Sequence, residues 1–236
     1  MFDVFDNDSD FYKYYLQLFP ARYTDNCFSS FLYYVVQQLE LRNTNIVNSD
    51  ELRMLRENTL KSTTNAVNYL FDNEGIDKLY PHHIKGVANL INEYEGYEGY
   101  RTTTVDVWES AFVPTPAGGI PAKMMSLIDN YYNVWNILDP YEREARFHLF
   151  MVRVQPFEDG NKRTAQLITG FNLMKNGCPP ILIKENDRDK YLEYIIKNDV
   201  NSFTDFLKTK SAEELEYIKQ LYLQYKNQNT NSALSR

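Results

Sequence analysis

The chain has 236 residues, with 25 Lys and Arg against 32 Asp and Glu, and therefore a formal net charge of −7. Contacts with nucleic-acid phosphates or with an anionic membrane surface need a surplus of basic residues, so we expect no nucleic-acid partner and no membrane partner. The hydrophobic share of 43%, including 15% aromatic residues, excludes a chain that is disordered throughout, because it supplies enough apolar surface for a core.

Turn-forming and cross-linking residues are scarce. The chain has only 9 Gly and 9 Pro, and sheet-rich folds use such residues at short intervals, so a mainly α fold is predicted. Two cysteines, Cys27 and Cys178, are too few for a disulfide framework and favour a reducing compartment. Since the acidic start of the sequence shows no secretion signal, we expect a cytoplasmic protein.

The first part of the chain is predicted to form amphipathic helices. Asp25 is expected to cap a helix, because apolar residues follow it at intervals of three and four: Phe28, Phe31, Leu32, Val35, Val36 and Leu39. Asn48 with Glu51 resembles a capping box and predicts a second helix that reaches Gly75. We predict that residues 1–98 form a helical extension that packs on the core.

A different pattern begins near residue 100. Pro81 suits the first turn of a third helix, which should stop before the glycine-containing turn at 95–99. The β-branched, alternating residues 101–108, followed by Phe112 and Val113, predict a β-hairpin. Residues 114–121 hold three prolines and two glycines, which predicts an irregular loop.

Helices are predicted again in the rest of the chain. Asp139 and Pro140 form a cap and first turn, and Ser211 with Glu214 resembles a capping box for a last helix. The expected helices cover residues 122–138, 141–154 and 161–176, with another that starts at Asp187. We expect C-terminal helices over 201–227 and a frayed polar tail over 228–236.

Residues 154–166 are where chemistry is expected. Pro156 stops the preceding helix, and Gly160 allows a positive φ just before a new helix starts at Asn161. The N–H groups of that helix start, together with the cations Lys162 and Arg163 beside them, form an anion site suited to phosphate. Asp159 lies where a hard divalent cation could bridge its carboxylate to a phosphate oxygen. An ordinary helix-entry turn with a solvated first turn is the alternative.

The order of residues in this segment resembles the signature of the Fic family, His-x-Phe-x-(Asp/Glu)-Gly-Asn-(Gly/Lys)-Arg, which here reads Gln155 to Arg163. The resemblance extends loosely over residues 99–192, through Gly99-Tyr100-Arg101-Thr102 and the pattern His148, Met151 and Val154. It implies a Fic-type helical bundle with a short β-hairpin flap, and a Fic core over residues 99–200.

Fic proteins mostly transfer AMP from ATP to a Ser, Thr or Tyr hydroxyl of a target protein, and the resemblance implies a role for each matching residue. Asp159 would hold Mg²⁺, and Arg163 would neutralise charge on the leaving pyrophosphate. The phosphate chain of ATP would lie on Gly160, Asn161 and Lys162. Phe157 would anchor the loop in the core. The flap residues Thr103, Thr104, Val105 and Asp106 would bind the target by strand addition.

Gln155 occupies the position of the family's catalytic histidine. An amide cannot take a proton from a hydroxyl near neutral pH, so a general-base contribution of ~10²–10⁴-fold should be missing while nucleotide binding remains. A natural pseudoenzyme, an inactivating substitution and a rearranged site with another base are the explanations left open. His148, two helical turns earlier, is interpreted as a packed core histidine.

Two further departures concern the phosphate end of the site. Lys162 stands where glycine is commoner in the family, and the related Doc toxins, which transfer phosphate, also depart from glycine in this way. A Doc-like kinase therefore stays open as an alternative function. Gln166 replaces an arginine found in many members. Glu57 weakly matches the family's inhibitory glutamate, although its helix lacks the preceding Ser or Thr.

A nucleotide-binding module without activity, a helical protein with a chance motif, and a homodimer also stay open.

Overall fold

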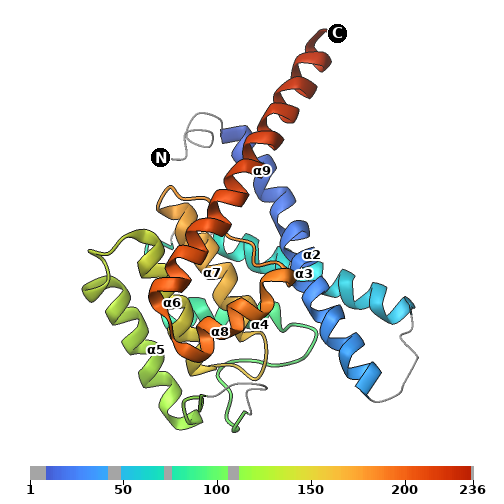
Figure 1. Cartoon of the computed structure of the whole chain (residues 1–236). Helices are drawn as coiled ribbons and strands as arrows, with labels where there is room; N and C mark the ends of the chain where they lie inside the picture. The colour runs from blue at the N-terminus through green and yellow to red at the C-terminus, as the bar shows by residue number, and fades with distance from the viewer. Residues whose placement is uncertain (1–8, 42–48, 72–75, 106–111, 235–236) are drawn as a thin grey trace.

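The structure is a computed structural model that describes residues 9–41, 49–71, 76–105 and 112–234; within these ranges it is built from helices, turns and loops. Its α-helices, labelled in Figure 1, are α2 (Ser9–Leu41), α3 (Ser49–Phe71), α4 (Pro81–Ile91), α5 (Ile120–Asp129), α6 (Pro140–Val154), α7 (Asn161–Lys175), α8 (Arg188–Lys197) and α9 (Val200–Leu234). Short elements are η1 (Ala117–Gly119), η2 (Asn130–Val134) and η3 (Glu185–Asp187). The mainly α fold class is confirmed for the described residues.

Helix α7 lies at the centre of the bundle. All its residues from Thr164 to Leu173 are buried, so its whole circumference faces protein, as expected of a central helix. It packs against α4 and α6, and α6 in turn packs against α9. Because α7 begins at Asn161, its N-terminus is set directly behind the loop that carries the sequence motif.

Several predicted helix boundaries are confirmed. Pro81 and Pro140 each occupy the first turn of a helix, and Asp139 caps α6 by accepting a hydrogen bond from Tyr141 N at 3.0 Å. Helix α7 ends at Lys175, one residue before the predicted end, and Gly177 follows it with φ 69°. Helix α3 starts at Ser49, whereas Asn48 lies outside the described residues.

The prediction that Asp25 starts a helix is wrong. Helix α2 runs through this position from Ser9 to Leu41, with Pro20 inside it. The reason is a buried aromatic face on the N-terminal side of Asp25, made of four residues at most 1% exposed: Phe11, Tyr15, Phe19 and Tyr23. Asp25 instead pairs with Arg56 of α3 at 2.5 Å.

The predicted capping box at Ser211 and Glu214 is also wrong, because α9 is continuous from Val200 to Leu234 and reaches into the expected frayed tail. Both side chains are buried and make tertiary bonds instead. Ser211 Oγ donates to Pro179 O at 2.7 Å. Glu214 accepts from Tyr15 at 2.9 Å and from Arg22 at 3.0 Å, which ties α9 to α2.

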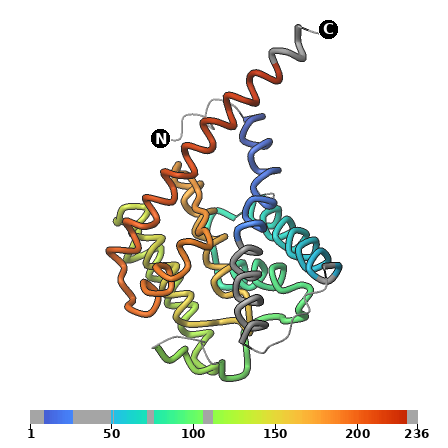
Figure 2. The backbone as a smooth tube through the Cα atoms, turned by 45° about the vertical axis from the view of Figure 1, so that its right-hand side comes forward, coloured from blue at the N-terminus to red at the C-terminus, as the bar shows by residue number. Residues whose placement is uncertain are grey.

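The C-terminal part of α9 projects away from the bundle, and the N-terminal part of α2 lies beside it (Figures 1 and 2). The Phe11 ring centroid is 4.8 Å from that of Tyr222 and 5.4 Å from that of Tyr225. Aromatic contact therefore joins the two projecting segments. No helix of the described part of the chain is both long and apolar enough to cross a membrane.

The predicted β-hairpin is not seen: the described residues 100–105 and 112–116 form no strand, and its central residues 106–111, with Asp106, lie outside the described ranges. One buried side chain bonds carbonyl groups in both arms of the predicted hairpin: residues 100–105, hereafter called the flap arm, and residues 112–116, the second arm. The Arg101 guanidinium donates to Thr103 O at 2.6 Å and to Thr115 O. These carbonyls are thus satisfied by a guanidinium, without pairing of the two arms to each other.

A buried carboxyl group joins three elements of the bundle. Glu144 of α6 is fully buried and accepts hydrogen bonds from Tyr131 of η2 at 2.5 Å and from Asn172 of α7 at 2.9 Å. Both bonds favour the ionised form, but burial outweighs them and raises the pKa of Glu144 from 4.5 to about 7.

This raised pKa predicts a loss of stability with rising pH. The folded protein retains the Glu144 proton between about pH 4.5 and about pH 7, whereas the unfolded chain releases it, so up to about 3 kcal/mol of unfolding free energy is lost across this window. Urea unfolding of wild type and Glu144→Gln at several pH values should show a smaller loss in the variant. The partly exposed Glu142→Gln is the control, and an unchanged pH dependence in Glu144→Gln would contradict the assignment.

Candidate active site

The site is the turn between α6 and α7, residues 155–160, together with the first turn of α7. Gln155 ends α6 in the left-handed conformation, with φ 50° and ψ 63°. The residue before a proline is disfavoured in the right-handed helical region, so Pro156 explains why the helix stops there. Gly160 then reverses the chain with φ 72° and ψ 7°, as predicted for the residue before α7.

Asn161 closes this turn. Its Oδ1 accepts from Phe157 N at 2.9 Å, and its Nδ2 donates to Phe157 O at 2.8 Å. The same Nδ2 donates to Gln155 Oε1 at 2.8 Å. Asn161 is 6% exposed and Phe157 1%, so one buried amide and one buried ring fix the path of the loop. Phe157 is therefore the core anchor that was expected.

The carboxamide of Gln155 is turned into the protein at both ends. Its Nε2 donates to Val152 O at 2.7 Å, and its Oε1 accepts from Asn161 at 2.8 Å. An amide has no proton-accepting group with a pKa near neutrality. Residue 155 as it stands therefore supplies hydrogen bonds to the loop and no general base.

The first turn of α7 presents a helix N-terminus with charged neighbours. The first hydrogen bond within the helix runs from Thr164 N to Gly160 O at 2.8 Å, so the earlier N–H groups point out of the helix end. Lys162 is exposed there. Arg163 is 26% exposed, and its Nη2 lies 3.1 Å from Asp159 Oδ2 and 3.4 Å from Glu95 Oε1. Helix dipole and cations together favour an anion at this position.

Asp159 offers oxygen ligands of the kind that Mg²⁺ prefers. Its side chain is 61% exposed, with Oδ1 accepting from Gly160 N at 2.6 Å and Oδ2 facing Arg163. Each carboxylate oxygen has a second lone pair, so these bonds leave room for a cation next to a phosphate. The described residues contain no cluster of three or more His, Cys, Asp or Glu, so a metal would need phosphate and water ligands as well.

Two residues that the sequence analysis did not select support the loop from outside. Asn92, at the end of α4, is 1% exposed and donates to Asp159 O at 2.9 Å, while its Oδ1 accepts from Arg163 at 3.3 Å. Arg101, 3% exposed, donates from Nε to Gln155 O at 2.6 Å, and its backbone N donates to Pro156 O at 3.0 Å. Of these two residues, only Arg101 could have been found from the sequence, because residues 99–102 resemble the entry to the Fic flap.

The remaining predicted residues lie as follows. Thr103 joins the flap arm to the motif loop, since its Oγ1 donates to Glu158 at 2.9 Å, while Thr104 and Val105 continue that arm. Glu57 is not brought to this loop by any bond of the described residues: its side chain on α3 is 67% exposed and lies 4.0 Å from Arg53. Glu95 is the glutamate that contacts the site arginine.

Two more of the residues discussed in the sequence, His148 and Gln166, are buried in the protein interior. His148 is fully buried, with its ring nitrogens 3.1 Å from Thr169 Oγ1 and 2.8 Å from Tyr191 Oη, and burial lowers its pKa to about 3. The interpretation as a core histidine is confirmed. Gln166 is 8% exposed, and its Nε2 is buried without a hydrogen-bond partner among the described residues.

The geometry agrees with the comparisons to known proteins. Residues 78–173 match the Fic/DOC family model. The chain is 36% identical over 117 residues to the protein adenylyltransferase Fic of Nematostella vectensis, covering 46% of this chain and 26% of the relative. It is 30% identical over 126 residues to the Culex quinquefasciatus protein of the same name, covering 51% and 24%. The chain thus spans about a quarter of these relatives' length.

Solved structures show the same fold. A Fic-domain-containing signalling protein from Bacteroides thetaiotaomicron matches with a TM-score of 0.63 at 22% identity, covering 91% of each chain. Fic-1 of C. elegans matches with a TM-score of 0.61 at 20% identity, covering 81% of this chain and 58% of Fic-1. IbpAFic2, solved in complex with adenylylated Cdc42, has a TM-score of 0.53 at 17% identity, covering 85% and 63%.

Gly160→Ala should damage the site more than it damages the fold. A Cβ at this position would lie 2.5 Å from Asn92 Oδ1, so Asn92 must move and release Asp159 and Arg163. An alanine at a positive φ also costs about 1 kcal/mol. Gly177→Ala is the matched control, because φ is +69° and no atom lies within 4 Å. Thermal unfolding with and without ATP·Mg²⁺ should show loss of the nucleotide-induced shift in Gly160→Ala alone. Equal shifts would contradict the role of Asn92.

Glu95→Gln should strengthen nucleotide binding. Glu95 and Arg163 form a partly exposed ion pair at 3.4 Å, and such a pair contributes up to about 1 kcal/mol, so its removal should lower the Kd for ATP·Mg²⁺ by up to about fivefold. Glu57→Gln, measured by the same calorimetric titration, is the control. A tighter Kd in Glu57→Gln with no change in Glu95→Gln would restore the inhibitory role predicted for Glu57.

Proposed function

We propose that the loop between α6 and α7 binds ATP with Mg²⁺ and that the protein is a protein adenylyltransferase of the Fic type whose chemical step is impaired by Gln155. The observation that carries the proposal is the arrangement of Asp159, Gly160 and Arg163 at the start of α7, held by Asn92. The names of the relatives support the reaction class.

In this reaction a hydroxyl oxygen of the target protein attacks the α-phosphorus of ATP, and pyrophosphate leaves. The helix N-terminus and Arg163 would stabilise the charge on the phosphates, and Asp159 would hold Mg²⁺. Mg²⁺, when bound, supplies Lewis-acid neutralisation of the phosphate oxygens. The proton of the hydroxyl has no acceptor at position 155, because both ends of the Gln155 amide are bonded within the loop.

The partner class follows from the arm beside the loop. Thr103 contacts Glu158 of the loop, and the exposed residues around it could add a target segment as a strand. The neighbour IbpAFic2 has been solved with adenylylated Cdc42, and we extend only the class of partner, a protein that becomes adenylylated, to this chain. The resemblance to Fic proteins adds that its acceptor is a Ser, Thr or Tyr hydroxyl.

Gln155→His should restore AMP transfer. Histidine tolerates a positive φ better than most residues, so it suits φ 50° at this position, and a general base contributes ~10²–10⁴-fold. Wild type, Gln155→His and Gln155→His with Arg163→Ala are incubated with Mg²⁺, α-labelled ATP and a cell lysate. Label on protein is expected in Gln155→His alone or far above wild type, and not in the double variant.

The same assay distinguishes the alternatives. No label in any variant, despite binding of ATP·Mg²⁺ by calorimetry, would overturn AMP transfer and leave a nucleotide-binding module. A parallel incubation with γ-labelled ATP tests the Doc-like kinase that Lys162 suggests. Label from the γ-phosphate without label from the α-phosphate would establish phosphate transfer instead.

A further inference from the structure

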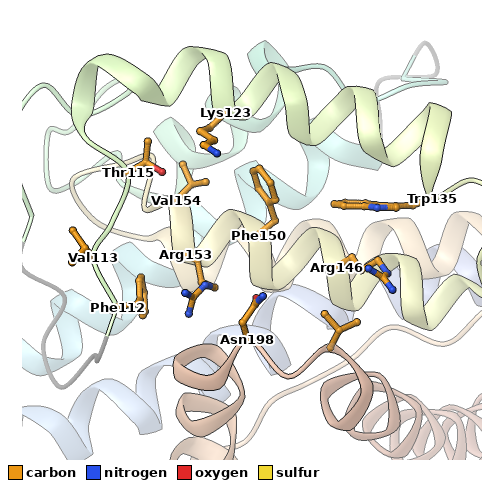
Figure 3. A pocket seen from close by; sticks show the side chains of 11 residues that line it. Phe112, Val113, Thr115, Lys123, Trp135, Arg146, Phe150, Arg153, Val154 and Asn198 are labelled. Carbon is orange, nitrogen blue, oxygen red and sulfur yellow. The ribbon is translucent and has the colours of Figure 1, made fainter.

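A cavity of about 330 Å³ lies beside the loop, outside the proposed nucleotide site. Figure 3 shows its lining: side chains of α5 and α6, with Trp135 after η2, face residues 112–115 and the turn between α8 and α9. Its volume is at the lower end of the range for ligand sites, which suits one or two side chains of a partner.

The charge of this cavity is opposite to that of the chain. Its lining contains three cations, Lys123, Arg146 and Arg153, and neither Asp nor Glu, although the chain carries a net charge of −7. Figure 3 shows Lys123 at one side of the cavity and the two arginines at the other. A cluster of like charges focuses a positive potential there and selects an anionic group.

The cations are positioned to different degrees. Arg153 is fixed, since its Nη1 donates to Ile195 O at 2.7 Å and Ile196 O at 3.1 Å, and its guanidinium lies 4.6 Å from the Phe112 ring centroid. Arg146 pairs with Glu142 at 2.7 Å. Lys123 is exposed and makes no bond with another side chain of the described ranges. An anion in the cavity would be the counter-ion that Lys123 lacks.

Apolar surface accompanies the charge. The rings of Trp135 and Phe150 lie edge to face at 6.4 Å, and both are only partly buried. On the adjoining segments Val113 is 92% exposed and Ile137 86% exposed. Partly buried Trp and Arg next to exposed aliphatic residues are typical of protein-binding surfaces.

The cavity is continuous with the proposed active site. Val154 lines it and directly precedes Gln155. Thr115 also lines it, and its carbonyl accepts from Arg101, which bonds Gln155 O and Thr103 O as well. A protein segment lying along the flap arm therefore has this cavity within reach.

From these contacts we infer that the cavity is a docking site for the target protein, and that it accepts an Asp or Glu next to an aromatic or aliphatic residue. This inference rests on the proposed function for the identity of its occupant, whereas the binding itself needs no nucleotide. The carboxylate would lie between Lys123 and the arginines, and its apolar neighbour would pack on Trp135 and Phe150.

Selection of random peptides displayed on phage tests the inference without ATP. Peptides selected on wild type should be enriched in Asp or Glu beside an apolar residue. In fluorescence polarisation, Lys123→Glu should weaken their binding by about tenfold, and the peptide's own Glu→Gln or Asp→Asn change should weaken it similarly. Binding to Lys123→Glu should partly recover when the peptide acid is replaced by Lys. Lys13→Glu, an exposed change on α2, is the control.

Three results obtained without nucleotide would overturn the inference: no acidic enrichment, equal binding to wild type and Lys123→Glu, or a dimer in sedimentation equilibrium that Lys123→Glu dissociates, which would make a second copy the occupant. Excess selected peptide should also reduce labelling of lysate proteins by Gln155→His. Labelling that the peptide leaves unchanged would show that the cavity is not the docking site for the target protein. Absence of any labelling counts against the proposed function, while the polarisation result still decides the cavity.

Discussion

The carboxamide of Asn161 is the interaction on which the site depends. Between α6 and α7 the chain must reverse within residues 155–160, and this amide bonds both the N–H and the C=O of Phe157, as well as the side chain of Gln155. One buried side chain thereby satisfies polar groups that the turn leaves unpaired. The direction of α7, and with it the direction of its N-terminal dipole, follows from this turn.

The supports around the turn explain how an acidic chain can present a site for an anion. Asn92 and Arg101 approach the loop from α4 and from the flap arm, and both are almost fully buried. The N–H groups of one helix end supply positive potential there, while the charge of Arg163 is shared between two carboxylates. Net charge describes the whole surface and gives no information about such a local arrangement.

The sequence predicted the motif loop well because its constraints are local. Pro156 and Gly160 dictate backbone geometry by their own chemistry, and the helix-starting prolines do the same. Predictions based on polar side chains failed where those side chains bond to distant elements: Asp25 to α3, Ser211 to the segment after α7, and Glu214 to α2. The hairpin is not seen in the described residues, where Arg101 bonds the carbonyl groups of Thr103 and Thr115. Asn92 and Glu95 carry no signal that a single sequence reveals.

One contact changes how the matched region should be regarded as a folding unit. Tyr23 of α2 donates its hydroxyl hydrogen bond to Arg163 O at 2.6 Å, and the aromatic row that ends at Tyr23 is almost wholly buried. Residues 78–173, the range that matches the family model, therefore leave out a helix that bonds to the backbone of the site arginine. A fragment cut at those limits would lose this hydrogen bond, and with it the link between α2 and the first turn of α7.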